Sequence, residues 1–202
     1  MCASYQSRFN LQQLVEAFDK AGAPLNGSAG LPNVPDVDEV RPTDRATVVL
    51  AGADGAAVLK TLSFGFPPPR PKAGPIINLR SEGRVFDNRD RTGRCLIPMS
   101  GFYEFTGDKY PKTRWVFRDP SEPLLCLAGV WRAGEGGGPD AFALLTTEPG
   151  PDIAPYHDRG VVVAPPERWA DWLGAAVFPA DLIGPTPAGT LAVSAAPRPP
   201  RS

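Results

Sequence analysis

Proline and glycine are spread along almost the whole chain, and they limit what it can fold into more than any other feature. The 202 residues include 25 prolines and 21 glycines. Proline ends helices and is excluded from sheet interiors, and glycine weakens both kinds of element. The sequence therefore predicts many short elements joined by turns, with few long helices.

Apolar residues recur at helical spacing in two places. Between Arg8 and Ala21 they alternate with glutamine and glutamate, which predicts an amphipathic helix. Pro166–Leu173 begins with proline at an early position and places two tryptophans and a leucine on one side, which predicts a short helix. A single helical turn is expected at 152–156.

Short runs rich in β-branched and aromatic residues predict strands in the rest of the chain. Thr47–Leu50 and Val58–Leu62 flank a glycine-containing turn and predict a hairpin. Three apolar runs are expected to be central strands of an antiparallel sheet: Trp115–Phe117, Leu124–Trp131 and Ala141–Thr147. Other strands are expected at Ile76–Arg80, Cys95–Pro98, Gly101–Phe105, Val161–Val163 and Leu191–Val193.

These elements predict an α+β fold, a single domain whose curved, mostly antiparallel β-sheet or barrel-like core is flanked by a few short helices. We expect this domain to span residues 1–196. The proline- and arginine-rich residues 197–202 are expected to form a disordered tail.

Composition and charge exclude several classes of protein. There is no run of eighteen apolar residues and no secretory signal, so we expect a cytoplasmic protein without a membrane partner. The three cysteines are widely spaced, which fits neither a disulfide framework nor a zinc site, and we expect no metal and no cofactor. A net charge of −1 gives no overall basic field for a nucleic acid.

Arginines nevertheless gather in one segment, where acidic residues interrupt them. The arginines are Arg80, Arg84, Arg89, Arg91 and Arg94, and the acids are Glu82, Asp87 and Asp90. A solvated loop of mixed charge is the ordinary interpretation of such a segment.

Three residues carry possible chemistry. Removal of Met1 would leave Cys2 with a free α-amine, and the amine and thiol of one cysteine can close a thiazolidine ring on an aldehyde carbon. Glu104 stands in a strand-like apolar run and suits acid-base chemistry, although a solvated strand face is commoner. His157 is the only histidine, and no Gly-x-Ser-x-Gly motif accompanies it.

Several blocks of the sequence, in this order, resemble the SRAP (SOS response-associated peptidase) family, whose members crosslink to abasic sites in single-stranded DNA. The blocks are Met1-Cys2, Asn78-Leu79-Arg80-Ser81-Glu82, the segment from Arg94 to Phe105, Leu145-Thr146-Thr147-Glu148 and His157-Asp158-Arg159. Val40-Arg41-Pro42-Thr43 and Phe64-Gly65-Phe66 resemble two further family blocks.

The resemblance implies a catalytic role for four residues. Cys2 would be the nucleophile, and Asn78 would hold its N-terminus and the ring-opened sugar. Glu104 would be the general acid and base, and His157 would assist proton transfer. The implied product is a covalent thiazolidine crosslink between protein and DNA.

The resemblance also implies how DNA is bound. Arg80 and Arg159 would take the phosphates that flank the lesion, and Thr147 would line the pocket. Phe64 and Phe66 are candidates for stacking on bases from an exposed position, with core packing as an equal alternative. The expected partner is single-stranded DNA that contains abasic sites, bound by a monomer.

The chain departs from the family pattern at several positions. Ala3-Ser4 replaces the usual Gly-Arg, and Phe64 replaces a tryptophan. Leu79 stands for an alanine, Gly160-Val161 for Met-Pro, and Ser194 for an asparagine. These departures predict weaker or altered DNA binding.

Two other functions remain open at this point. Cys2 could serve only in self-removal of Met1 or in thiol proteolysis, or the chain could be a non-catalytic module that binds single-stranded DNA.

Overall fold

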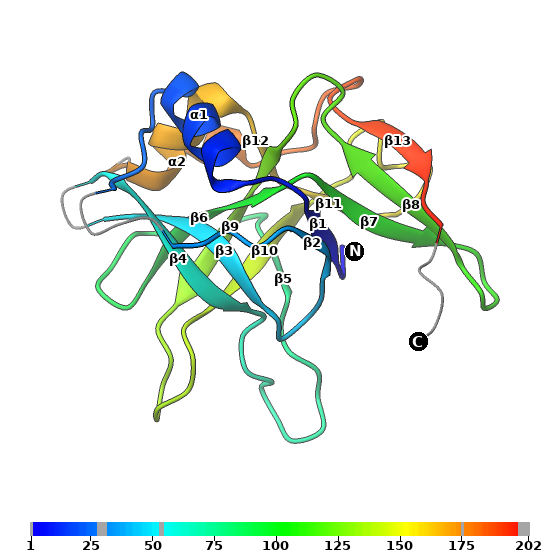
Figure 1. Ribbon diagram of the computed structural model, residues 1–202. Coiled ribbons are helices and arrows are strands. Elements are labelled where there is room, and N and C mark those ends of the chain that lie inside the picture. The colour runs from blue at the N-terminus through cyan, green and yellow to red at the C-terminus, as the bar shows by residue number, and fades with distance from the viewer. Residues whose placement is uncertain (1, 28–31, 53–54, 175, 198–202) are drawn as a thin grey trace.

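A closed ring of five β-strands lies at the centre of the computed structural model, which describes residues 2–27, 32–52, 55–174 and 176–197 (Figure 1). The strands follow one another around the ring as β10 (Ala141–Thr147), β4 (Ala57–Phe64), β3 (Arg45–Ala51), β6 (Thr92–Met99) and β9 (Leu125–Arg132). β9 then pairs back to β10, which closes the ring. Among these pairings only β10 with β4 is parallel, so the predicted mostly antiparallel, barrel-like core is confirmed.

Three very short strands extend the ring at its surface. β5 (Asn78–Arg80) pairs in parallel with β10, β11 (Gly160–Val161) also pairs with β10, and β12 (Val163–Ala164) pairs with β9. The predicted single strand Val161–Val163 is wrong, because Val162 lies between two strands. Its N–H donates to Leu145 O and its carbonyl accepts from Ala128 N, so this residue is bonded to both neighbours.

A second sheet of five strands stands beside the ring. Its order is β13 (Ala192–Ala195), β8 (Thr113–Arg118), β7 (Gly101–Thr106), β1 (Tyr5–Ser7) and β2 (Val37–Val40). Only Ser100 separates β6 from β7, so the chain passes directly from the ring into this sheet. A Cβ on Gly101 would lie 2.7 Å from Phe117 O, so glycine is required where β8 approaches the start of β7.

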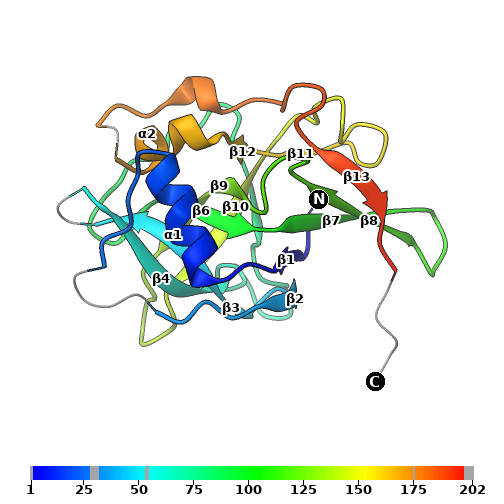
Figure 2. The same cartoon turned by 45° about the horizontal axis from the view of Figure 1, so that its top comes forward.

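Alternating side chains divide the core into two clusters. Val48 and Leu50 of β3 point into the ring, whereas Val49 points outward to the helices. The inner cluster continues under the second sheet and contains Cys2 and Tyr5. The first described residues therefore pack against the core, and β1 lies between β7 and β2 in Figure 2.

The helices lie side by side at one end of the ring in both views. α1 (Leu11–Lys20) starts at Asn10, whose side chain accepts from Gln13 N while Gln13 caps Asn10 N in return. α2 (Trp169–Gly174) follows the 3₁₀ turn η1 (Pro166–Arg168), and a second 3₁₀ turn, η2 (Ala180–Leu182), comes later. Phe18 of α1 packs on Trp169 of α2 at 4.5 Å between ring centroids. Both predicted helices are confirmed, with the first shortened by its cap.

Two expectations about strands need correction. Trp115–Phe117 is not a central strand beside β9 and β10, because it belongs to β8 in the second sheet. The strands β1 and β2 were not predicted at all. Each is only three or four residues long, too short for an alternating pattern to identify it.

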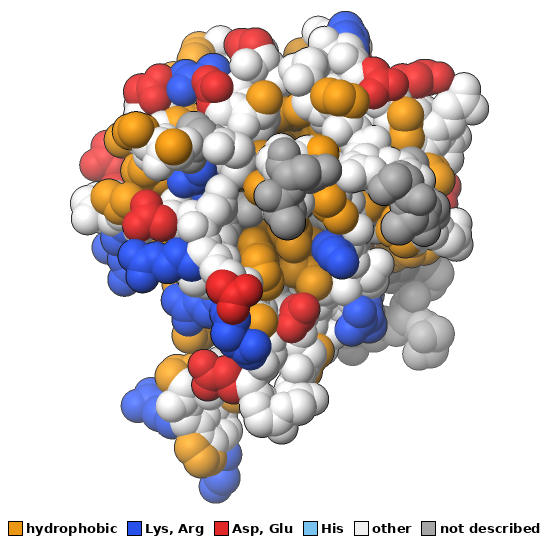
Figure 3. Space-filling model, turned by 90° about the vertical axis from the view of Figure 1, so that its left-hand side faces the viewer, with side chains coloured by type: hydrophobic (Ala, Val, Ile, Leu, Met, Phe, Trp, Pro, Cys, Tyr) orange, Lys and Arg blue, Asp and Glu red, His pale blue; other side chains and the backbone are white. Residues whose placement is uncertain are grey.

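No helix in the described ranges is long and apolar enough to cross a membrane. On the face shown in Figure 3, positive and negative side chains are interspersed, in keeping with the near-zero net charge. Of the expected C-terminal tail, residues 198–202 lie outside the described residues.

Candidate catalytic site around Cys2

Cys2 lies three residues before β1, which is inserted between β2 and β7 in the second sheet. Its side chain is fully buried, and its Sγ lies 3.5 Å from Ser4 O. Burial, followed by the negative charge of Glu104, raises the pKa of the Cys2 thiol far above its ordinary value. The thiol is therefore protonated at neutral pH, and Cys2 and Glu104 are electrostatic neighbours. Met1, on whose removal the predicted chemistry depends, lies outside the described residues.

Asn78 is held beside Cys2 by the edge of the ring. It opens β5, where pairing with Leu144 of β10 fixes its position. Its Nδ2 donates to Cys2 O at 2.9 Å. Its Oδ1 is buried and has no hydrogen-bond partner among the described residues. The Nδ2 of Asn78 thus positions Cys2, and its Oδ1 is available to accept a hydrogen bond.

Glu104 lies in the middle of β7, opposite Trp115 of β8. Only 3% of its surface is exposed, and burial raises the pKa of its carboxyl above the ordinary value. A carboxyl whose protonated form is favoured can donate as well as accept a proton nearer to neutral pH. The strand arrangement therefore produces an acid-base group beside a thiol.

His157 ends a tight turn that packs over the second sheet. Its N–H donates to Ile153 O at 3.0 Å, and the neighbouring Tyr156 ring packs on Trp115 and Phe117 of β8. This turn lies over Trp115, the cross-strand partner of Glu104. The negative charge of Asp158, which follows the turn, also raises the pKa of Glu104.

Two polar groups contact Nδ1 of His157. The N–H of Arg159 donates to it at 2.9 Å, and Asp158 Oδ1 lies 2.8 Å away. The first contact fits a ring with its proton on Nε2, and the second fits a proton on Nδ1, so the two contacts compete. Burial lowers the pKa of His157, which shifts the balance toward the neutral ring.

The two arginines implied for DNA binding differ in their state. Arg80 is exposed at the end of β5, two positions after Asn78 and on the same side of the strand. Arg159 is largely buried and donates two hydrogen bonds to Glu82, one of them at 2.9 Å to Oε2. These bonds lower the pKa of Glu82 to about 2. Arg159 is therefore already paired with an anion, whereas Arg80 faces solvent.

Of the two alternatives left open for Phe64 and Phe66, stacking on bases from an exposed position or core packing, the structure shows core packing. Phe64 is fully buried between Tyr5 and Phe142, with ring centroids 5.5 Å and 5.2 Å away. Phe66 is also buried, beneath the guanidinium of Arg132 at 4.6 Å. Phe64 ends β4, whose alternation turns it into the ring, so both rings fill the core instead of facing solvent.

Thr147 is buried at the end of β10 and lines a cavity of about 460 Å³ together with Ser81, Glu82 and Glu148. The preceding Thr146 accepts from Arg159 and donates to Leu79 O.

Two groups that contact candidate site residues were not predicted. Glu82 lies in one of the family-like blocks, but the sequence did not identify it as the partner of Arg159; its negative charge was the available signal. Tyr5 lies in the same inner cluster as Cys2, and its buried OH has no hydrogen-bond partner among the described residues. Its burial could not be read from a three-residue strand. In the described part of the chain, no group of three or more acidic, histidine or cysteine side chains could hold a metal ion.

Comparisons with known proteins agree with the resemblance. The family model described as "SOS response associated peptidase (SRAP)" matches residues 1–194. The chain is 32% identical over 128 residues to proteins named abasic site processing protein YoqW from Bacillus subtilis (strain 168) and Bacillus phage SPbeta. That match spans 57% of this chain and 57% of each relative.

Solved structures share the fold. A protein from Bordetella bronchiseptica superposes with a TM-score of 0.69 at 23% identity, covering 98% of this chain and 100% of that chain. A protein from Bacteroides thetaiotaomicron has a TM-score of 0.68 at 14% identity, covering 96% and 91%. A phage-related protein from Bordetella bronchiseptica also has a TM-score of 0.68, at 20% identity and with 98% and 95% coverage. With the family model matching nearly the whole length, the chain belongs to the SOS response associated peptidase (SRAP) family.

Proposed function

We propose that the protein processes abasic sites in single-stranded DNA by forming a covalent thiazolidine crosslink through Cys2 after Met1 is removed. The observation that carries the proposal is the bond from Asn78 Nδ2 to Cys2 O, made beside the buried carboxyl of Glu104. A relative that shares 32% identity is named an abasic site processing protein, which supports this substrate class. A DNA substrate places the activity inside the cell.

The reaction begins at the amine. The ring-opened abasic site presents an aldehyde, and an α-amine with a reference pKa of roughly 7.7 to 8.0 is partly neutral at cellular pH. The nitrogen adds to the aldehyde carbon, and loss of water leaves an imine. Glu104, with its raised pKa, supplies the proton to the departing hydroxyl.

The thiol completes the ring. The sulfur forms a bond to the imine carbon, the carbon–nitrogen π pair moves to nitrogen, and the thiol proton ends on that nitrogen through Glu104. The overall change is amine, thiol and aldehyde to thiazolidine and water. Since both nucleophiles belong to Cys2, the second step is intramolecular, with an effective molarity on the order of 10⁵ M.

The remaining side chains suit the sugar and phosphates. Asn78 Oδ1 is free to accept a hydroxyl of the opened sugar, and the ring of His157 can assist proton transfer. Arg80 is exposed beside them for a phosphate. Arg159 reaches a phosphate only by exchanging its bond to Glu82, so its contribution should be smaller.

The test incubates protein with single-stranded DNA that contains one abasic site and measures the adduct on a denaturing gel. Wild type should form the adduct, and Cys2→Ala should form none. Cys126→Ala is the matched control, because Cys126 is also a buried free thiol but packs in the outer cluster. An equal adduct from Cys2→Ala, or loss of the adduct in a folded Cys126→Ala, would contradict the proposal.

A second candidate, a thiol peptidase or self-processing activity at Cys2, is favoured by the family's description as a peptidase. A peptidase cysteine needs a thiolate, usually through a lowered pKa, whereas burial raises the pKa of Cys2. Amine-first chemistry is therefore the better fit. Intact-mass measurement of wild type and Glu104→Gln separates the two, because retained Met1 in the variant without any DNA adduct in wild type would favour self-processing.

A further inference from the structure

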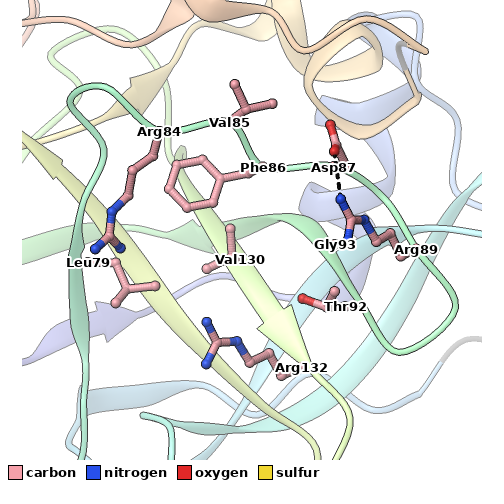
Figure 4. A pocket seen from close by; sticks show the side chains of 10 residues that line it. All are labelled: Leu79, Arg84, Val85, Phe86, Asp87, Arg89, Thr92, Gly93, Val130 and Arg132. Carbon is pink, nitrogen blue, oxygen red and sulfur yellow. Dashed lines mark hydrogen bonds and ion pairs between the residues drawn. The ribbon is translucent and has the colours of Figure 1, made fainter.

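An arginine-lined pocket of about 380 Å³ lies between β5, the β6–β9 side of the ring and the loop that follows β5. Leu79, Phe86 and Val130 provide apolar walls, and three arginines surround them: Arg84, Arg89 and Arg132. Figure 4 shows these side chains around one space, with the guanidinium groups of Arg84 and Arg132 on the side near Leu79. We call this space the arginine pocket.

The arginine pocket is separate from the site at Cys2. In β5, Asn78 and Arg80 lie on one side of the strand and Leu79 on the other. Leu79 and Phe86 pack against the outer cluster of the core, whereas Cys2 belongs to the inner cluster. A DNA strand that reaches Cys2 would therefore lie on the opposite face of β5 from the arginine pocket.

The pocket carries an excess of positive charge in a chain whose net charge is −1. Arg89 is paired with Asp87 at 3.2 Å, and its side chain points to Asp87 in Figure 4. Arg84 and Arg132 form no ion pair with a carboxylate among the described residues. The guanidinium of Arg132 stacks over Phe66, which fixes its direction. Two arginines are thus available to an anion.

The walls of the pocket are held in place before any ligand arrives. Arg94 donates to Phe86 O at 2.8 Å, and Asn88 donates to Leu173 O of α2. Arg89 N donates to Thr92 O at 2.7 Å, which closes the end of the loop. A pre-ordered wall reduces the entropy lost when a ligand binds.

We propose that the arginine pocket binds one nucleotide unit, with its phosphate between Arg84 and Arg132 and its base against Phe86, Leu79 and Val130. Guanidinium groups match phosphate oxygens in geometry and charge, and an aromatic side chain accepts a base of any sequence by stacking. The volume is within the range of pockets that hold small ligands. The inference rests on the proposed function only where it assigns this nucleotide to the bound DNA strand. A free nucleotide would present the same phosphate and base.

The experiment compares two double variants with equal loss of charge. Arg84→Gln with Arg132→Gln removes both available arginines. Arg45→Gln with Arg70→Gln is the control, because both are exposed arginines outside the arginine pocket. Affinity for undamaged twenty-residue oligothymidylate is measured by fluorescence anisotropy between 50 and 300 mM salt. Binding of thymidine monophosphate is measured by nuclear magnetic resonance titration.

Loss of the one proposed phosphate contact should reduce the slope of log affinity against log salt by about 0.7 in the pocket variant, since each phosphate neutralised on a single strand contributes about 0.7. The control pair should retain more of the wild-type slope. A reduced slope identifies a nucleotide of the strand. An unchanged slope with loss of monophosphate binding identifies a free nucleotide instead. A pocket variant that matches the control in both measurements overturns the proposal.

Two further measurements keep the result interpretable. If the double variant does not show the wild-type melting transition, Arg84→Gln alone is used, and its slope should be reduced by less than the value of about 0.7 for a fully released phosphate. The abasic-site adduct is measured in parallel. No adduct in wild type together with a slope change at the pocket would refute the proposed function and leave the arginine pocket standing.

Discussion

Two ionisable side chains are buried in consecutive strands, and the protein treats them in opposite ways. Arg94 of β6 is almost fully buried, and its Nε and Nη1 donate to Trp172 O and Phe86 O at 2.5 Å and 2.8 Å. Glu104 of β7 is equally buried, but it lies beside the thiol of Cys2 and has a raised pKa. The hydrogen bonds of Arg94 connect a loop and a helix to the ring. Burial of Glu104, in contrast, makes its charged form unfavourable in free energy.

The difference separates a structural charge from a reactive one. Main-chain carbonyls of α2 and of the loop compensate the desolvation of Arg94 and are themselves satisfied by it. For Glu104, burial shifts the balance between its two protonation states, which is what acid-base chemistry requires. Substitution at these two positions should therefore affect different properties.

The largest effect is expected at Glu104. Glu104→Gln keeps the shape of the side chain and removes its proton transfer, so the adduct should form about 10² to 10⁴ times more slowly. The melting temperature should not fall, because a neutral amide is easier to bury than a carboxylate. Single-turnover gel assays and thermal melts check both expectations. If Glu104→Gln crosslinked at the wild-type rate, Glu104 would have only a structural role, as Arg94 does, and the prediction would be wrong.

Arg94→Met should give the reverse result. It leaves two buried carbonyls without donors and should lower the free energy of unfolding by about 2 to 4 kcal/mol. Well below its melting temperature, the variant should still crosslink within about twofold of wild type, a margin small beside the acid-base effect. Urea titration measures the loss of stability. Arg84→Met, in an exposed arginine of the same segment, is the control and should leave the midpoint almost unchanged.

The smallest effect concerns pH. The carboxyl of Glu104 has a higher pKa in the folded protein than in the unfolded chain. Its contribution to the free energy of unfolding is therefore fully present below the unfolded pKa and is lost as the pH rises through the folded pKa. The stability of Glu104→Gln relative to wild type should therefore increase from pH 4 upward and level off above the folded pKa. The same difference for Arg94→Met should stay flat from pH 5 to 8, because the pKa of Arg94, although lowered by burial, starts far above this range. A flat Glu104 difference would contradict the assignment of a raised pKa.

The sequence predicted elements that depend on local patterns and missed those that depend on distant partners. The hairpin of β3 and β4 is confirmed because its two strands and its turn are adjacent in the chain. The membership of Trp115–Phe117 in the second sheet could not be read from its apolar run, which suits either sheet. For Phe64, the sequence left an exposed position beside the proline-rich loop and core packing equally open, and the alternation of β4 places it inside the ring.

The candidate site came from resemblance more than from periodicity. Spacing alone left Glu104 and His157 undecided, since a carboxylate in a strand usually faces solvent. The ordered blocks identify both residues as candidates. The structure adds contacts that no block contains: the bond from Asn78 to Cys2 O, the pairing of Arg159 with Glu82, and the contacts of His157 Nδ1 with Arg159 N and Asp158. These contacts join residues that are far apart along the chain.

The insertion of β1 between β2 and β7 determines which part of the second sheet can form first during synthesis of the chain. β7 begins at residue 101, so the ribosome must add most of the first hundred residues before Cys2 can be enclosed in the second sheet. At typical rates of protein synthesis, this interval is roughly 5 to 20 s. The proposed removal of Met1 has this interval in which to act on an open chain, before the new amine is enclosed where it is to react.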